Sequence, residues 1–279
     1  MKRIITDKAI NAFEKYLLEN EKAQATREKY MRDLHFFAEY AADRALDKPL
    51  VLDYKASLEQ TYAIRSANSM LAALNSFLRF MGWYELCVKQ FRIQKDAYCS
   101  EEKELTKAEY AALVKAAEQK KNERLSLVVQ TICGTGIRVS ELQSITVEAA
   151  RKGEAVVYCK GKTRKIFIVS ALRKKLLRYA AEQKIASGMI FITKRGKPLD
   201  RSNIWREMKN LCEESGVSPQ KVFPHNLRHL FARTFYGIEK DIAKLADILG
   251  HSNINTTRIY IITTGAEHRR RMENMRLII

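Results

Sequence analysis

The sequence of 279 residues lacks the patterns typical of zinc proteins, nucleotide hydrolases and membrane proteins. Its five cysteines are widely spread and form no C-x-x-C pair, which disfavours a zinc site and a disulfide framework. It contains no H-E-x-x-H motif, no G-x-x-x-x-G-K-[ST] loop and no cluster of carboxylates suited to Mg²⁺. No apolar run approaches the roughly 18 residues that span a bilayer. We therefore expect a protein without a metal, a nucleotide cofactor or a membrane span.

Acidic residues are scarce relative to basic ones. Fifty Lys and Arg stand against 32 Asp and Glu, which gives a formal net charge of +18. Such a charge favours polyanionic partners, of which nucleic acid is the commonest, although a merely soluble or ribosome-associated basic protein has the same composition. The opening stretch MKRIITDKAI also lacks the apolar segment of a secretory signal. We expect a cytoplasmic protein that associates with the nucleoid when it binds DNA.

Apolar residues in the first ninety positions recur at helical spacing. Three sets each form one stripe along a helix. They are Ile10, Phe13 and Leu17; Tyr30, Leu34, Phe37 and Ala41; and Ala67, Leu71, Leu74, Leu78 and Met81. The stripes must be buried against one another, so residues 1–95 are predicted to form a small helical bundle.

A charged stretch without periodicity follows the bundle, and we interpret residues 96–104 as a linker. Thr106 with Glu109 three residues later then forms a capping box before an apolar run, which predicts the first helix of a second domain, 105–279. That domain is expected to be mainly helical. Its exception is AVVYCKGKTRKIFIV, residues 155–169, where two β-rich runs flank a turn and predict a hairpin.

The predicted hairpin has a strongly basic tip. Four cations lie within six residues there: Lys160, Lys162, Arg164 and Lys165. A solvated charged turn would have this composition, and so would a tip that contacts DNA phosphates.

Three other stretches hold residue types suited to phosphate chemistry. CGTGIRVSEL places Arg138 after a glycine turn, and its planar guanidinium matches two phosphate oxygens. FPHNLRHLFA places His225 and Arg228 on one face of a predicted helix, with His229 interpreted as structural. LGHSNINTTRIY places His251 just after a helix that ends at Gly250. Tyr260 follows nine residues later, on the next predicted helix.

The ordered set of G-x-R-x-S-E-L, a basic hairpin, P-H-x-L-R-H, L-G-H-S and a later Tyr resembles the tyrosine recombinase (phage integrase) family, in the layout of its Xer-like and compact members. The resemblance covers essentially the whole chain. It implies a SAM-like helical core-binding domain followed by a catalytic domain with the DNA breaking-rejoining fold. It also implies site-specific cleavage and rejoining of duplex DNA through a 3′-phosphotyrosine, without metal or ATP.

The same resemblance assigns roles to individual positions. Tyr260 matches the nucleophile, and Arg138, Arg228 and His251 match the groups that hold the phosphate oxygens. Lys160 matches the general acid, with the nearby Lys162 as the alternative, and His225 matches an assisting acid or base. Glu141 matches the supporting acidic residue, while Lys162, Arg164 and Lys165 are expected to contact DNA.

The resemblance also predicts an assembly on DNA, a dimer on each site and a tetramer at synapsis, with the C-terminal tail EHRRRMENMRLII docking on a neighbouring protomer. A second recombinase or an accessory protein is a further candidate partner. A type IB topoisomerase-like relaxing enzyme has similar catalytic residues, but the N-terminal helical domain and P-H-x-L-R favour a recombinase. A catalytically silent DNA-binding regulator is disfavoured by the complete residue set. A metal-dependent nuclease would lose its activity to a chelator.

Overall fold

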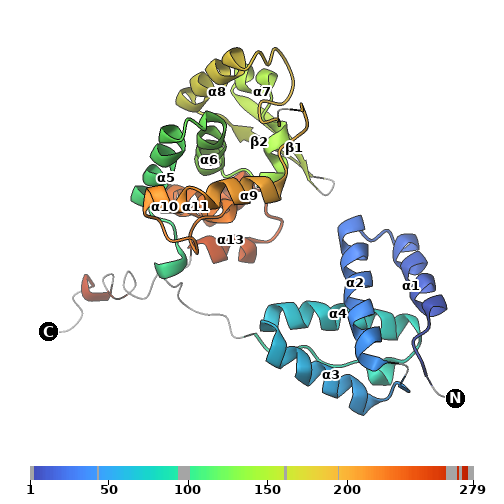
Figure 1. The fold of residues 1–279 in the computed structure, drawn as a ribbon. Helices are drawn as coiled ribbons and strands as arrows, with labels where there is room; N and C mark the ends of the chain where they lie inside the picture. The colour runs from blue at the N-terminus through green and yellow to red at the C-terminus, as the bar shows by residue number, and fades with distance from the viewer. Residues whose placement is uncertain are drawn as a thin grey trace. The chain divides into compact units, whose positions relative to one another are not determined.

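The computed structural model describes residues 3–42, 44–93, 101–159, 162–193, 195–261, 269 and 272–275, and the side chains of residues 101, 159, 162 and 261 lie outside this description. The chain divides into two compact units, Met1–Lys95 and Asp96–Ile279. Both are mainly helical, and the second contains a two-stranded sheet (Figure 1). The predicted fold class, mainly α with a small β-hairpin, is confirmed. None of the described helices has the length and hydrophobicity of a membrane span.

The first unit is a bundle built on the three predicted stripes. Its elements are α1 (Asp7–Glu19), α2 (Gln24–Ala41), α3 (Lys48–Thr61), α4 (Ile64–Phe80) and the short 3₁₀ helix η1 (Tyr84–Leu86). Phe13, Phe37 and Leu71 from these stripes are fully buried in one core. Figure 1 shows α2 beside α4, the pair with the most extensive contacts in this unit.

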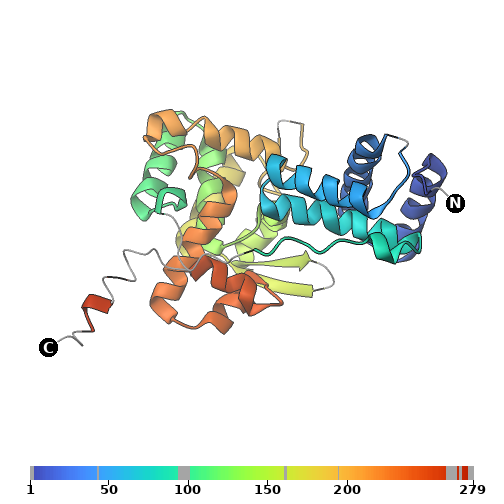
Figure 2. The same ribbon diagram turned by 90° about the horizontal axis from the view of Figure 1, so that it is seen from below.

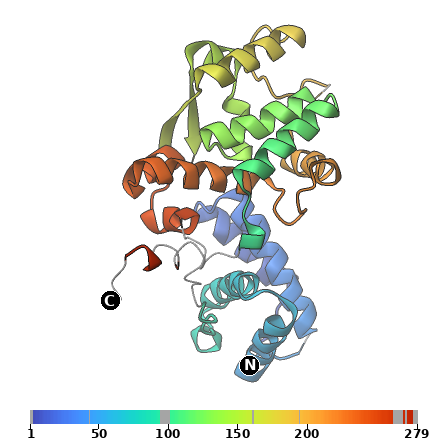
Figure 3. The ribbon, with the colours of Figure 1, turned by 90° about the vertical axis from the view of Figure 1, so that its left-hand side faces the viewer.

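The second unit begins with η2 (Glu101–Lys103), α5 (Lys107–Gln119), α6 (Glu123–Thr135), η3 (Val139–Ser144) and α7 (Val147–Lys152). It continues with β1 (Glu154–Cys159), β2 (Lys162–Phe167), α8 (Ser170–Glu182), α9 (Arg201–Lys209) and α10 (Cys212–Ser215). The helices α11 (Pro224–Glu239), α12 (Ile242–Leu249) and α13 (Ile254–Ile261) close it. The helix α6 packs against α5, α8 and α11, so it lies at the centre of this unit, and Figure 3 shows α5 and α6 side by side.

The start of the second unit is held to α11 by a hydrogen bond and an ion pair. The capping box of Thr106 and Glu109 forms as predicted at the N-terminus of α5. Of the predicted linker, residues 96–100 lie outside the described ranges, whereas Lys103 and Glu104 contact α11. The Asn226 side chain donates to the Lys103 carbonyl at 2.7 Å, and Glu104 forms an ion pair with Arg233.

The predicted hairpin is present as the antiparallel pair β1 and β2, in a register that places Val157 opposite Arg164 and Val156 opposite Lys165. Val157 is buried and Val156 is exposed, so the two faces of the hairpin differ. Because successive side chains in a strand point to opposite faces, Arg164 shares the buried face with Val157. Figure 2 shows this hairpin beside the helices α12 and α13, and β2 contacts α12.

Candidate active site

The site begins at the glycine turn that follows α6. Gly136 ends α6 with a φ of +65°, and a Cβ there would lie 2.5 Å from the Phe231 ring, so glycine is the residue that fits. Arg138 follows as the N-cap of η3. Its backbone N–H donates to Glu141 Oε2 at 2.9 Å and its Nη1 donates to Oε1 at 2.8 Å. Both oxygens of one carboxylate therefore orient Arg138.

Glu141 is itself 5% exposed and is ionised in this position. Burial raises its pKa, but the hydrogen bonds from Arg138 and the charges of Arg164 and Arg138 outweigh that effect and hold the pKa below its usual value. Its Oε2 also accepts from Arg164 Nη2. One carboxylate thus serves two guanidinium groups.

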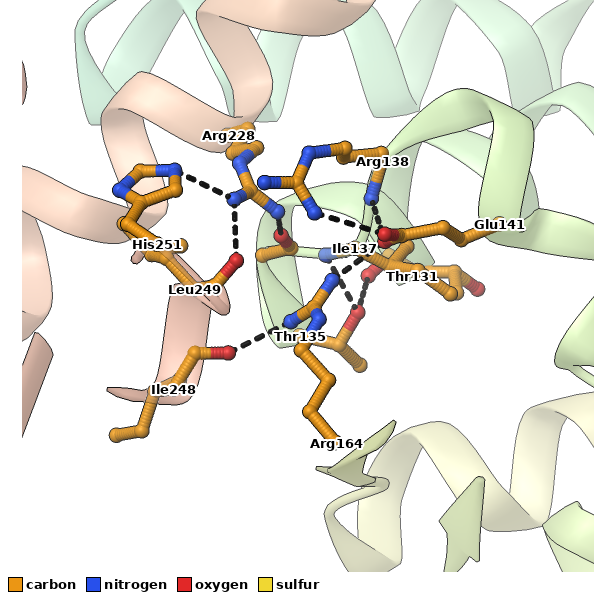
Figure 4. Close-up of polar contacts among 11 residues, drawn as sticks. Thr131, Thr135, Ile137, Arg138, Glu141, Arg164, Arg228, Ile248, Leu249 and His251 are labelled. Atoms are coloured by element: carbon orange, nitrogen blue, oxygen red, sulfur yellow. Dashed lines mark hydrogen bonds and ion pairs between the residues drawn. The ribbon is translucent and has the colours of Figure 1, made fainter. Parts of the chain in front are cut away.

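Arg228 is the most deeply buried cation of the site, with 2% of its surface exposed. Its Nη1 donates to the Gly136 carbonyl, and its Nη2 donates to the Leu249 carbonyl at 2.7 Å and lies 3.0 Å from His251 Nε2 (Figure 4). These partners are neutral, and no carboxylate in the described ranges forms an ion pair with Arg228. Burial first, and then the charge of Arg138, lower the pKa of Arg228 to about 10. The site holds a desolvated positive charge that an anion would compensate.

His251 is positioned by the end of α12. Gly250 caps that helix with a φ of +65°, as predicted, and the His251 N–H donates to the Ala246 carbonyl at 2.9 Å. Because Arg228 has only donors, His251 Nε2 must accept from it. The ring proton is therefore on Nδ1, which donates to Thr257 Oγ1 at 2.9 Å. Burial first, and then the charge of Arg228, lower the pKa of His251 to about 4, in agreement with a neutral ring.

Tyr260 lies within the second unit among three histidines and is 6% exposed. Its ring centroid lies 4.3 Å from that of His229, 5.4 Å from that of His251 and 5.5 Å from that of His225. The Tyr260 phenol raises the pKa of Arg228 and so partly offsets the effect of burial. An effect of this kind requires proximity, so the phenol lies beside that guanidinium. The predicted nucleophile and the predicted anion-holding residues therefore meet in one place.

His225 stands at the open side of this group, near the N-terminus of α11. Loss of hydration, followed by the charges of Arg228 and Arg201, lowers the pKa of His225 below its usual value. The ring is therefore neutral at physiological pH, and it can accept or relay a proton.

The hairpin residues do not all lie where the sequence predicted. Lys160 is outside the described residues, as is the side chain of Lys162. Lys165 is exposed and pairs with Glu154, with Nζ 3.4 Å from its Oε2. The prediction that Arg164 is part of an exposed tip is wrong: its side chain is 11% exposed and binds Glu141 and the Ile248 carbonyl. The reason is the strand register, which turns Arg164 toward the interior.

A pocket of about 730 Å³ opens onto Arg138, His225, Arg228 and Tyr260. Its other wall includes four residues from the first turns of α9: Arg201, Ser202, Trp205 and Arg206. Four arginines thus line the pocket, and none of its described lining residues is acidic. Across the described ranges, no three His, Cys, Asp or Glu side chains gather in a way that could hold a metal ion. The pocket is suited to a polyanion.

The comparisons with known proteins agree with this geometry. The model of the phage integrase family matches residues 103–266, and that of the phage integrase N-terminal SAM-like domain matches residues 10–84. The tyrosine recombinase XerA of Pyrococcus horikoshii is 30% identical over 286 residues, covering 99% of this chain and 96% of that protein. This chain belongs to the phage integrase family of tyrosine recombinases. The tyrosine recombinase XerD of Pseudomonas aeruginosa is 30% identical over 87% of this chain and 88% of its own length.

Solved structures show that this tyrosine recombinase has the fold of its family. A lambda integrase dimer bound to a COC′ core site matches with a TM-score of 0.74 at 20% identity, over 91% of this chain and 76% of that chain. The XerH site-specific recombinase bound to its difH substrate matches with a TM-score of 0.69 at 17% identity, over 95% of this chain and 84% of that chain.

Sequence reasoning missed several residues of the recombinase site. Thr257 binds His251 and is fully buried, and no sequence motif identified it. His229, interpreted as structural, packs its ring against Tyr260. The available signal was its spacing of four from His225, which places both on one helix face. Arg201 and Trp205 line the pocket and were likewise recognisable by a spacing of four on α9.

Proposed function

We propose that this site-specific recombinase cleaves duplex DNA by attack of the Tyr260 phenol oxygen on a backbone phosphorus. The new bond joins that oxygen to phosphorus as a 3′-phosphotyrosine, and the bond from phosphorus to the 5′-oxygen breaks. Rejoining reverses these steps with the 5′-hydroxyl of another strand, so the phosphodiester energy is conserved. Neither metal nor ATP enters this scheme.

One observation carries the proposal: Arg228 is 2% exposed, lies beside Arg138 and Tyr260, and has only neutral hydrogen-bond acceptors among the described residues. A phosphate bound there would supply the missing negative charge. The charge that builds up in the pentacoordinate transition state would be held by donors that are already oriented, which is an effective form of catalysis.

The other residues divide the proton transfers between them. We assign the protonation of the leaving 5′-oxygen to Lys160, with Lys162 as the alternative. His225, neutral and open to the pocket, accepts the phenol proton or relays it. To hold a phosphate oxygen, His251 would release Arg228 and take up a proton on Nε2, which the negative charge of the bound phosphate favours. Glu141 keeps Arg138 in place and does not touch the substrate.

We assign residues 1–95 to core-site binding, 96–104 to the linker and 105–279 to catalysis. Two findings on relatives support DNA as the substrate and a homo-oligomer as the active species. Solved structures with this fold include a lambda integrase dimer on a core site and a lambda integrase tetramer on a Holliday junction. The proposed assembly is a dimer on each site and a tetramer at synapsis, acting on DNA in the cytoplasm, with Lys162 and Lys165 contributing to DNA affinity.

The C-terminal tail is proposed to dock on a neighbouring protomer of that assembly. Most of residues 262–279 lie outside the described ranges, and Met272 and Met275 are exposed. Deletion of residues 272–279 should weaken assembly of two sites more than binding of one half-site. Equal losses in the two gel-shift assays would contradict trans docking.

A nicked suicide duplex that carries the native site tests the proposed reaction. The wild-type protein should be trapped as a covalent adduct, because the short nicked fragment diffuses away before rejoining. Tyr260→Phe should bind the duplex with normal affinity and give no adduct. An adduct that persists in Tyr260→Phe would refute the assignment of the nucleophile, and relaxation of a plasmid without exchange between two sites would favour a topoisomerase.

A further inference from the structure

We infer that Arg164 is a positioning residue that holds three parts of the active site in one arrangement: the hairpin, the Arg138 turn and the turn that carries His251. This inference deepens the proposed function and rests on it. It replaces the expectation that Arg164 contacts DNA.

The first observation is the pair of bonds made by the guanidinium. Arg164 Nη2 donates to Glu141 Oε2, the oxygen that also accepts from the Arg138 backbone N–H. Arg164 Nη1 donates to the Ile248 carbonyl at 2.6 Å. Figure 4 shows the side chain reaching from the hairpin to both partners. A planar fork can satisfy two acceptors at fixed spacing, which a single ammonium group cannot reproduce.

The second observation is the close approach of Arg164 to Gly250. A Cβ on Gly250 would lie 2.5 Å from Arg164 Cδ and 2.9 Å from its Nε. The Arg164 side chain cannot move aside without breaking its bonds to Glu141 and Ile248, because both hold its far end. The residue immediately before His251 is therefore packed directly on Arg164.

The third observation is the contrast with Lys165, the next residue of the strand. Lys165 lies opposite the exposed Val156 and its side chain is 61% exposed, whereas Arg164 lies opposite the buried Val157 and is 11% exposed. Arg164 is turned away from solvent and, unlike the buried Arg228, is not among the residues that line the pocket. Glu141 and the Ile248 carbonyl replace water around the buried guanidinium and so compensate for its loss of hydration.

These contacts give Arg164 a specific effect on the reaction. Through Glu141 it fixes the guanidinium of Arg138, and through Ile248 and Gly250 it fixes the turn that presents His251. It is itself part of β2, the strand that leads out of the tip containing Lys160. The hairpin is thereby tied to the phosphate-binding groups.

The decisive experiment separates cleavage from binding in Arg164→Ala. Single-turnover cleavage of the suicide duplex is measured at saturating protein, and the dissociation constant is measured over a range of salt concentrations. We expect the cleavage rate to fall on the order of 10- to 100-fold, because small misplacements of reacting groups have effects of this size. The dissociation constant and its salt dependence should match wild type.

A wild-type cleavage rate at saturation in Arg164→Ala would overturn the inference. If binding were also weaker, with a salt slope reduced by about one, Arg164 would instead be a phosphate contact. If the wild-type protein formed no adduct, the proposed function would fail together with the inference. A wild-type adduct with an unaffected Arg164→Ala refutes the inference alone.

Arg164→Lys and Arg178→Ala complete the comparison. Arg164→Lys keeps the charge, and its rate should lie between those of wild type and Arg164→Ala; a full wild-type rate would contradict the need for the fork. Arg178 pairs with Glu123 and Glu182 outside the pocket, so Arg178→Ala should cleave and bind as wild type. Arg178→Ala is therefore the control for a general effect of removing an arginine that binds two acceptors.

Gly250→Ala tests the packing of the His251 turn on Arg164. The added methyl group should lower the cleavage rate in the wild-type background. The same change should have a smaller effect in Arg164→Ala, where the atoms that it meets are gone, so the two effects should not be additive. Strict additivity would contradict the packing.

The pH profile gives a readout that a general loss of stability would not change. Arg138 and Arg164 are the charged groups that face Glu141. Without Arg164, the pKa of Glu141 should rise, so cleavage should begin to fail at a higher pH as the solution is acidified. An acid limb at the wild-type position would count against the connection through Glu141.

Discussion

His251 Nδ1 lies 2.9 Å from Thr257 Oγ1, so the residue predicted to hold the phosphate is bonded to the helix that carries Tyr260. Thr257 is fully buried and precedes Tyr260 by three residues, which is nearly one helical turn. Arg228 can only donate to Nε2, so the ring proton of His251 is on Nδ1 and the Thr257 hydroxyl accepts it. The nucleophile helix and the anion-binding turn are therefore joined by one hydrogen bond.

Thr257→Val removes that bond with little change in shape. We expect the cleavage rate on the suicide duplex to fall about 10-fold, which corresponds to the roughly 1.4 kcal/mol that a hydrogen bond typically contributes. Thr257→Ser keeps the hydroxyl and should retain most of the activity. Equal rates in Thr257→Val and wild type would show that the bond does not position His251.

The stability of the second unit should depend on pH through His229 and His251. Burial is the first cause of both low pKa values, each about 4, against a value near 6.5 in the unfolded chain. Between these values the unfolded chain binds more protons, so stability is lost as the pH falls from 6.5 toward 4. Urea unfolding at a series of pH values should show this slope.

His229→Gln is the variant that checks the origin of the slope. Each neutral buried histidine contributes at most about 1.4 kcal/mol per pH unit, so removing one should make the curve shallower by up to that amount. His35→Gln, a change in the first unit, is the matched control and should leave the slope unchanged. An unchanged slope in His229→Gln would contradict its burial as a neutral ring.

The fold class was predictable because local signals agree with the tertiary structure. The stripes in residues 1–95 have helical periodicity, and the capping box of Thr106 and Glu109 forms as its spacing predicts. The turn at Gly250 was predictable for the same reason, since a positive φ after an apolar helix favours glycine.

The contacts of Arg164 were not predictable from charge alone. Its partner Glu141 is 23 residues away in the chain and Ile248 is 84 residues away, so no local pattern connects them. Val156 and Val157 are the same residue type, so the sequence does not show that only Val157 is buried. Four cations within six residues also favoured a solvated tip, because charged residues are mostly exposed.

Asn75 should contribute strongly to the free energy of unfolding of the first unit. Its side chain donates to the Val88 carbonyl at 2.8 Å and accepts from the Val88 N–H at 2.9 Å, in a buried position. Asn75→Ala leaves both backbone groups without these partners, which we expect to lower the free energy of unfolding by about 2–4 kcal/mol. Asn20→Ala, which removes an exposed bond to the Tyr16 carbonyl, should cost less than about 1 kcal/mol. Chemical unfolding of both variants makes the comparison, and equal losses would contradict it.

The choice between Lys160 and Lys162 as the general acid can be made with a modified substrate. If the 5′-oxygen at the cleavage site is replaced by sulfur, the leaving thiolate needs no proton, because a thiol is a far stronger acid than an alcohol. Lys160→Ala should therefore cleave normal DNA poorly and the sulfur-containing DNA nearly as fast as wild type does. Lys162→Ala should show no such selective rescue, since loss of a DNA contact weakens binding to both substrates alike. Arg138→Ala should stay slow on both, because sulfur does not replace a group that holds the phosphate oxygens. Rescue of Lys162→Ala alone would transfer the role to Lys162, and rescue of neither lysine variant would exclude both as the proton donor.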